Sequence, residues 1–229
     1  MIISTEHKII YLSNCKCAST TIRKRFLPIT NGYLTKEVET AMNTNPHAPY
    51  ERVKKYLLEQ HNIDADTFFL FSTIRNPWER IVSLYNYCKP DKNGVPFWSS
   101  KFGIERIEGT SCTFEEFVYS SLYHDYNRTA GSFRHACKNI KNMFGEQYDK
   151  FKLYKSEELD INKILSDVGD SEVDSKISKE PFQIVDSNHW DSIKNDRDSK
   201  NYREYYNDKI KDIIADHYKL DIEIGEYEF

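Results

Sequence analysis

The sequence lacks the features that mark several large classes of protein. No apolar stretch is long enough to cross a membrane and no signal peptide is present, so we expect a cytoplasmic protein without a membrane partner. Neither charge dominates, since 32 Lys and Arg stand against 36 Asp and Glu, and we therefore expect no nucleic-acid partner. Internal repeats and low-complexity tracts are also absent, which is typical of a globular enzyme or binding domain.

Cysteine is scarce and irregularly spaced. An odd number of cysteines without regular spacing argues against a disulfide framework; the five are Cys15, Cys17, Cys88, Cys112 and Cys137. Cys15 and Cys17 are close enough to suggest half of a metal site, but no second pair of Cys or His residues stands near them. We expect neither disulfide bonds nor a bound metal.

The sequence does contain alternating strand-like and helix-like segments. Apolar runs predict strands at 8–12, 67–74 and 151–155, and apolar periodicity predicts helices at 20–26, 50–61, 76–89, 114–125, 132–144, 162–168 and 201–220. Segments 28–49 and 170–200 are expected to be loop-rich. The alternation predicts an α/β fold, with a mainly parallel central sheet and helices on both faces. The 229 residues fit a single domain over 1–229, with an insertion of helices and loops at about 90–150.

The clearest motif is YLSNCKCASTTIRKRF, at Tyr11–Phe26, which joins a predicted strand to a predicted helix. Backbone N–H groups at a helix start attract anions, the hydroxyls of Ser19, Thr20 and Thr21 add donors, and Lys16 adds a positive charge. The loop contains no glycine, and the motif G-x-x-x-x-G-K-[ST] is absent, which disfavours a nucleoside triphosphatase. The alternative is a strand–turn–helix with incidental Ser and Thr caps.

A second motif, FSTIRNPWERIVSLYNY, spans Phe71–Tyr87. Arg75 follows the second predicted strand, so it should reach the same sheet edge as the first loop. Asn76 and Pro77 predict a helix start, and Ser83 falls outside the apolar stripe of that helix. A surface arginine and a solvated serine are the alternative. Two anion-binding motifs on neighbouring strand ends nevertheless favour a ligand with two separated anionic groups.

Together the two motifs resemble the signature of sulfotransferases that use 3′-phosphoadenosine-5′-phosphosulfate (PAPS). The stretch K-C-A-S-T-T (Lys16–Thr21) resembles their 5′-phosphosulfate loop. The stretch R-N-P-W-E-R-I-V-S-L-Y (Arg75–Tyr85) resembles their 3′-phosphate motif. The resemblance is greatest to the carbohydrate branch, which includes the heparan and uronyl 2-O enzymes and bacterial relatives. Cys15 replaces the family's usual proline, and Ser19 replaces a glycine that is common in the wider family.

This resemblance implies a P-loop-NTPase-like sulfotransferase fold, PAPS as co-substrate, 3′,5′-ADP as product, and no metal. Arg75 and Ser83 would hold the 3′-phosphate. The segment before the last helix would fold over the nucleotide, with Arg197, Lys200 and Tyr202 as contacts. The phosphosulfate would be held by Lys16, Cys17, Ala18, Ser19, Thr20 and Thr21, and Lys16 would also be catalytic.

A catalytic base is the remaining requirement. In similar enzymes a histidine between the two motifs takes this role, and here His47 lies in N-P-H-A-P. A plain loop histidine is the alternative, and His124 and His135 are further candidates. His217 falls on the apolar face of the last helix and is expected to be structural.

The acceptor is expected to be a hydroxyl group, in line with the carbohydrate branch a saccharide. Two other functions stay open. One is a catalytically inactive module that binds 3′,5′-ADP or PAPS. The other is a small-molecule or nucleotide kinase, which the missing triphosphate loop disfavours.

Overall fold

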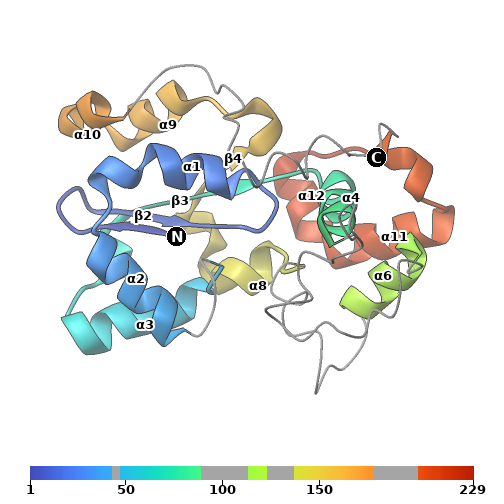
Figure 1. Ribbon diagram of the computed structural model, residues 1–229, viewed down its shortest axis with the longest axis horizontal. Helices are drawn as coiled ribbons and strands as arrows, with labels where there is room; N and C mark the ends of the chain where they lie inside the picture. The colour runs from blue at the N-terminus through green and yellow to red at the C-terminus, as the bar shows by residue number, and fades with distance from the viewer. Residues whose placement is uncertain (43–46, 89–112, 123–136, 178–200) are drawn as a thin grey trace, which may run out of the picture. The chain divides into compact units, whose positions relative to one another are not determined.

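The computed structural model describes residues 1–42, 47–88, 113–122, 137–177 and 201–229 (Figure 1). The chain forms two compact units. The first consists of Met1–Arg75 and Lys138–Glu180, and the second of Asn76–Cys137 and Pro181–Phe229. The expectation of one domain with an insertion at about 90–150 remains a prediction.

The first unit is built on a four-stranded sheet in the order β1-β2-β3-β4. The strands are β1 (Ile2–Ser4), β2 (Ile9–Leu12), β3 (Phe69–Ile74) and β4 (Lys152–Lys155). β1 pairs with β2 antiparallel, whereas β2 with β3 and β3 with β4 are parallel. The predicted α/β fold with a mainly parallel sheet is therefore confirmed. The short strand β1 was not predicted separately, because three residues give little periodic signal.

Helices cover both faces of this sheet, as Figure 1 shows. One face carries α1 (Ser19–Arg25), α9 (Ile161–Val168) and α10 (Ser171–Lys176); the other carries α2 (Gly32–Ala41), α3 (Tyr50–His61) and α8 (Ile140–Phe144). Short 3₁₀ turns complete the unit: η1 (Leu27–Ile29), η2 (Ala65–Thr67), η3 (Gly145–Lys150) and η4 (Ser156–Glu158). Such a layered arrangement leaves the carboxyl ends of the parallel strands open for a ligand site.

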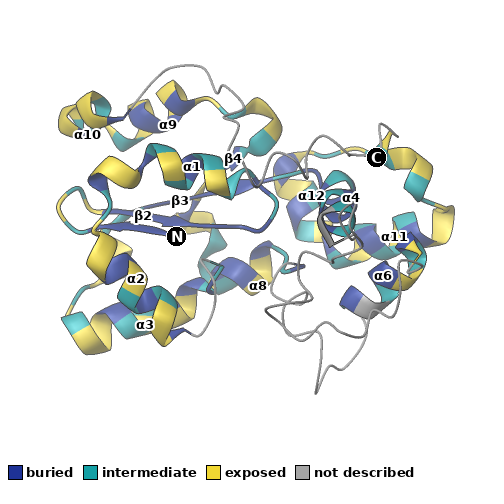
Figure 2. Cartoon of the chain, viewed as in Figure 1, coloured by how far each residue is buried: buried dark blue, intermediate teal, exposed yellow. Residues whose placement is uncertain are grey.

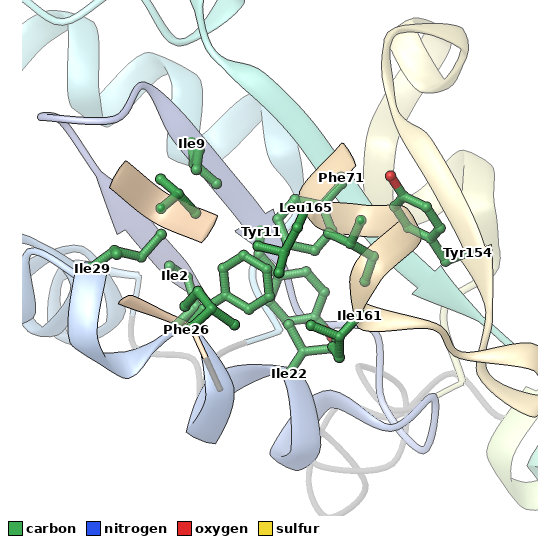
Figure 3. Close-up of a cluster of buried hydrophobic side chains, with 13 residues drawn as sticks. Ile2, Ile9, Tyr11, Ile22, Phe26, Ile29, Phe71, Tyr154, Ile161 and Leu165 are labelled. Atoms are coloured by element: carbon green, nitrogen blue, oxygen red, sulfur yellow. The ribbon is translucent and has the colours of Figure 1, made fainter. Parts of the chain in front are cut away.

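A hydrophobic core lies between the sheet and the helices α1, α9 and α10 (Figure 3). The ring centroid of Phe71 lies 4.9 Å from that of Tyr11 and 5.3 Å from that of Phe26. Ile22 is also fully buried in this core. Ile22 lies in α1 and Phe26 caps its carboxyl end. Their burial in the core therefore fixes the position of α1, and with it the end of the loop that leads into this helix.

Two segments expected to be loop-rich contain helices. Within segment 28–49, the Asn31 side chain accepts a hydrogen bond from Leu34 N at 3.1 Å and caps α2. Asp170 caps α10 in the same way, accepting from Glu172 N at 2.8 Å. The same residue types favour turns and helix N-termini, which explains both errors.

The described part of the second unit is helical. It contains α4 (Pro77–Cys88), α6 (Phe114–Leu122), η5 (Tyr202–Tyr205), α11 (Asp208–His217) and α12 (Lys219–Gly225). Figure 2 shows that α4 buries part of its surface, and Trp78, Ile81 and Leu84 are among its buried residues. Asn76 caps α4 as predicted, accepting from Trp78 N at 3.1 Å.

The long helix predicted over 201–220 is instead divided. Asn207 accepts a hydrogen bond from Ile210 N at 2.9 Å and begins α11, and Tyr218 separates α11 from α12. Ile210 and Ile214, four positions apart on α11, are both buried. Of the helix predicted at 132–144, the structure describes residues 137–144, and among these Ile140–Phe144 form α8 after the cap residue Asn139. Nothing among the described helices combines the length and apolar character needed to span a bilayer.

Candidate functional site

The first motif continues β2 beyond its carboxyl end. Leu12, the last residue of β2, pairs with Ser72 of β3, so the loop after Leu12 runs beside the end of β3. The thiols of Cys15 and Cys17 are buried, whereas Lys16 between them is half-buried. The loop backbone is thus inside the unit while the lysine side chain is partly accessible.

The loop has an unusual backbone despite containing no glycine. Lys16 and Ala18 both adopt left-handed conformations, with φ of 61° and 59°. Only a few per cent of non-glycine residues do so, and such residues cost of order 1–3 kcal/mol each and cluster at ligand sites. Left-handed residues in a turn direct successive N–H groups to one side and so form anion-binding concavities. No sequence signal indicated these conformations.

Hydroxyl groups of β3 hold the loop in this form. The Thr73 hydroxyl donates to the carbonyl oxygen of Cys17 and lies 2.9 Å from the Tyr11 hydroxyl. The Ser72 hydroxyl donates to the carbonyl of Leu12 at 2.6 Å. Burial raises the pKa of Tyr11, which keeps its hydroxyl protonated as a donor to Thr73. Thr73 was not predicted as a site residue, although two hydroxyl residues inside an apolar strand are a signal for such a role.

His47 is joined to the start of this loop. Its Nδ1 atom lies 2.7 Å from the carbonyl oxygen of Ser13. A carbonyl only accepts, so Nδ1 carries the hydrogen, and in the neutral imidazole the lone pair is on Nε2. His47 is half-buried and precedes the buried Ala48 and the first residues of α3. His47 is therefore bonded to Ser13, three positions before Lys16 along the chain, and both predicted catalytic residues belong to the first unit.

Lys138 also approaches this region, although no sequence signal pointed to it. Its Nζ atom lies 3.5 Å from the carbonyl oxygen of His47. Burial lowers the pKa of Lys138, and the nearby charge of Arg52 lowers it further. Lys138 thus adds a positive group to the segment that carries the histidine.

Arg75 directly follows Ile74, the last residue of β3, and is half-buried. Because β2 and β3 are parallel, Arg75 and the loop after Leu12 leave the sheet at the same edge. The predicted position of Arg75 at a strand end is thereby confirmed, while its role remains a prediction.

Ser83 and Tyr202 belong to the second unit. Ser83 is half-buried on α4, outside the buried stripe formed by Ile81 and Leu84. The Tyr202 ring contacts the Phe229 ring edge-on, with centroids 5.8 Å apart, and the Arg203 guanidinium lies 4.8 Å above it. Both predicted residues are thus partly accessible.

Arg80, also on α4, is a buried charged residue. Its guanidinium lies 3.8 Å from the Asp221 carboxylate and 5.5 Å from the centroid of the Tyr218 ring. Arg80 therefore serves the packing of α4 against α12. A sequence pattern could not show this, because Asp221 is 141 positions away along the chain.

The other candidate residues divide into two groups. Arg197, Lys200, His124 and His135 lie outside the described residues. His217 is placed as expected for a structural histidine: its Nε2 atom lies 3.2 Å from the Cys137 carbonyl oxygen, and burial lowers its pKa.

Comparison with known proteins gives one result. Residues 1–228 match the sequence model described as the Sulfotransferase family. No curated protein and no solved structure matches the chain significantly. The family match extends over both motifs and over the sheet that positions the first of them. The chain therefore belongs to the sulfotransferase family.

Proposed function

We propose that this sulfotransferase moves the sulfuryl group of PAPS to a hydroxyl group of an acceptor, and that the acceptor is a saccharide. Family membership supports sulfuryl transfer in general. The choice of PAPS comes from the two anion-binding motifs, and the saccharide from the resemblance to the carbohydrate branch. Within this proposal the whole chain acts as one sulfotransferase domain.

The observation that supports the proposal most is the hydrogen bond between His47 and Ser13. It attaches a candidate base to the loop that would hold the sulfuryl donor. The bond also selects the tautomer in which Nε2 accepts a proton.

In the proposed reaction, the loop holds the phosphosulfate of PAPS. Lys16 and Ala18 give the backbone its left-handed turns, and Cys17, Ser19, Thr20 and Thr21 complete the ligand set. The Lys16 ammonium stabilises the charge that develops on the 5′-phosphate as its bond to sulfur breaks. Such stabilisation accelerates the reaction because it is stronger in the transition state than in the bound substrate.

The acceptor oxygen attacks sulfur in line with the departing phosphate oxygen, as in phosphoryl transfer. The new S–O bond forms as the bond between sulfur and the bridging oxygen breaks, and the electron pair of the breaking bond leaves with 3′,5′-ADP. His47 Nε2 takes the proton of the acceptor hydroxyl, while Nδ1–H keeps its bond to the Ser13 carbonyl. Proton removal by a positioned base is worth about 10²–10⁴ in rate.

The remaining contacts concern the nucleotide. Arg75 and Ser83 would grip the 3′-phosphate, since a guanidinium and a hydroxyl form charge-assisted bonds to it. Tyr202 offers an aromatic ring beside the adenine, with Arg197 and Lys200 as further contacts. These roles come from the resemblance.

Two measurements test the proposal together. Calorimetry should show 3′,5′-ADP binding more tightly than 5′-AMP or ATP, and ³⁵S-labelled PAPS should transfer label to a pool of glycans. Tight binding of 3′,5′-ADP without transfer to any glycan or small alcohol would indicate the inactive module. Preference for ATP would instead indicate a kinase. Transfer should persist in EDTA, since the proposed reaction uses no metal.

A further inference from the structure

A second cluster of chemically active side chains lies away from the phosphate loop. Glu6 and His7 occupy the turn between β1 and β2, and Glu172 lies in the first turn of α10 (Figure 1). One ligand atom from each of these three residues lies within 4.8 Å of the other two. Acidic residues on a surface often gather without a ligand, so the cluster requires evidence from the histidine.

His7 supplies that evidence. Its side chain is only 2% exposed, and its Nδ1 atom lies 2.9 Å from the Asp170 carboxylate. Nδ1–H donates to this carboxylate, so the Nε2 atom faces Glu6, 4.0 Å from Oε1. Nε2 is buried and has no hydrogen-bond partner among the described residues. Buried polar atoms normally have a partner, so an unpartnered Nε2 atom beside two carboxylates is a position for a bound ion or water.

The cluster already attracts a positive charge. The Lys176 ammonium lies 2.6 Å from the Glu172 carboxylate and 3.9 Å from that of Glu6. No bond from Lys176 reaches the imidazole, so the lysine neutralises the carboxylates but leaves Nε2 unsatisfied.

We propose that Glu6, His7 and Glu172 bind a divalent transition metal of the Zn²⁺ class. Imidazole nitrogen and carboxylate oxygen are both ligand atoms of Zn²⁺, and three protein ligands leave the fourth position of a tetrahedral site to water. Metal-bound histidines usually donate their other N–H to a carboxylate, and Asp170 occupies this place. The side chains of Glu6 and Glu172 are 71% and 58% exposed, so they can close on the ion while Lys176 turns toward solvent.

The position of the site indicates a structural role. The turn that carries Glu6 and His7 precedes β2, whereas the phosphate loop follows it, so the two lie at opposite ends of this strand. A metal here would join the β1–β2 turn to α10 and stabilise the first unit. Sulfuryl transfer does not require it, and the proposal is independent of the proposed function.

The test is metal binding by chelator-stripped full-length protein, with Zn²⁺ in calorimetry and Co²⁺ in visible absorption. We expect one site that raises the melting temperature, and loss of that site in His7→Ala. Asp170→Asn should weaken binding by about 10–100-fold. Lys176→Gln should strengthen it, because the internal competitor is removed. Lys219→Gln, which removes another exposed i,i+4 pair with a glutamate, should leave binding unchanged.

His61→Ala is the matched histidine control and should leave metal binding unchanged. His61 is half-buried, but its Nε2 atom already has a partner in Glu37, at 3.0 Å. Should His7→Ala unfold, Glu6→Gln at an exposed position provides the same test and should weaken binding. Equal binding by wild type, His7→Ala and Glu6→Gln would overturn the proposal. Binding at millimolar Zn²⁺ only, or no gain in Lys176→Gln, would also overturn it.

Discussion

The imidazole Nδ1 of His47 and the carbonyl oxygen of Ser13 lie 2.7 Å apart, so the candidate base is bonded to the residue from which the anion-binding loop departs. This bond gives His47 two separable functions. Through Nδ1 it supports the loop, and through Nε2 it can accept a proton.

Substitution of His47 can separate these functions. His47→Asn retains a side-chain N–H for the Ser13 carbonyl but has no base, so turnover should fall by about 10²-fold or more while 3′,5′-ADP affinity is kept. His47→Ala should lose turnover and some affinity. In the wild type, kcat/KM should fall at acid pH, where imidazole is protonated. Retention of both the rate and this acid limb in the variants would exclude His47 as the base, and His124 and His135 would be tested next.

Lys16→Ala should reduce kcat by about 10²–10³ and change 3′,5′-ADP affinity much less, because the ammonium matters most as the leaving group gains charge. Single-turnover kinetics with PAPS and calorimetry with 3′,5′-ADP measure the two effects. Lys8→Ala is a matched control, since Lys8 also has a left-handed backbone, with φ of 50°, and lies before β2. Unchanged turnover in Lys16→Ala would contradict the proposed mechanism.

Arg75→Ala should weaken 3′,5′-ADP by roughly 1.5–3 kcal/mol and 5′-AMP by far less, since only the former has a 3′-phosphate. Ser83→Ala should show the same preference with a smaller loss. Calorimetry with both nucleotides provides the comparison. An equal loss for the two nucleotides in Arg75→Ala would place the arginine away from the 3′-phosphate.

Ala18→Gly should stabilise the protein by about 0.5–1 kcal/mol. Glycine removes the steric cost of the left-handed conformation, about 1–2 kcal/mol. Glycine also loses more conformational entropy on folding, which offsets part of this gain. Urea unfolding measures the change. Ala48→Gly, at a buried residue outside the left-handed region, should destabilise instead. A destabilised Ala18→Gly would show that the loop does not carry this strain.

Asp66 should make the first unit sensitive to acid. Burial opposes ionisation of its carboxylate, but hydrogen bonds from Lys54, Tyr50 and Lys150 outweigh this effect and lower the pKa. A carboxylate whose pKa is lower in the folded state than in the unfolded state stabilises the fold at any pH above its unfolded pKa, ~3.9. This stabilisation is lost as the pH falls from that value toward the folded-state pKa. Asp66→Asn should therefore lower the melting temperature at pH 7 and have a shrinking effect below pH ~4. If Asp66→Asn lowers the melting temperature by the same amount at every pH, the loss would come from packing and not from the charge of Asp66.

The sequence predicted the elements whose signals are local and strong. Helix α3 was predicted at its observed bounds from apolar periodicity, and in the structure Pro49 precedes it and Asn62 ends it in a left-handed conformation. β3 was recognised as a continuous apolar run, and Asn76 as the cap of α4. The positions of Lys16 and Arg75 after parallel strands followed from these elements.

What could not be predicted depends on contacts between distant segments. The hydrogen bond from His47 to Ser13 crosses 34 positions, and that from Thr73 to Cys17 crosses 56. The left-handed turns at Lys16 and Ala18 are imposed by such contacts against local preference, so no local pattern reveals them. The burial of Arg80 beside Asp221 is of the same kind.

The hydroxyl of Thr73 has a consequence for protein design. It links the core tyrosine Tyr11 to the backbone of Cys17, so the shape of the loop is encoded partly in a neighbouring strand. A transplant of the segment Leu12–Thr21 into another scaffold would not reproduce the loop by itself. Thr73 would have to be carried with it on a parallel strand in the same register, and His47 on the segment that precedes α3.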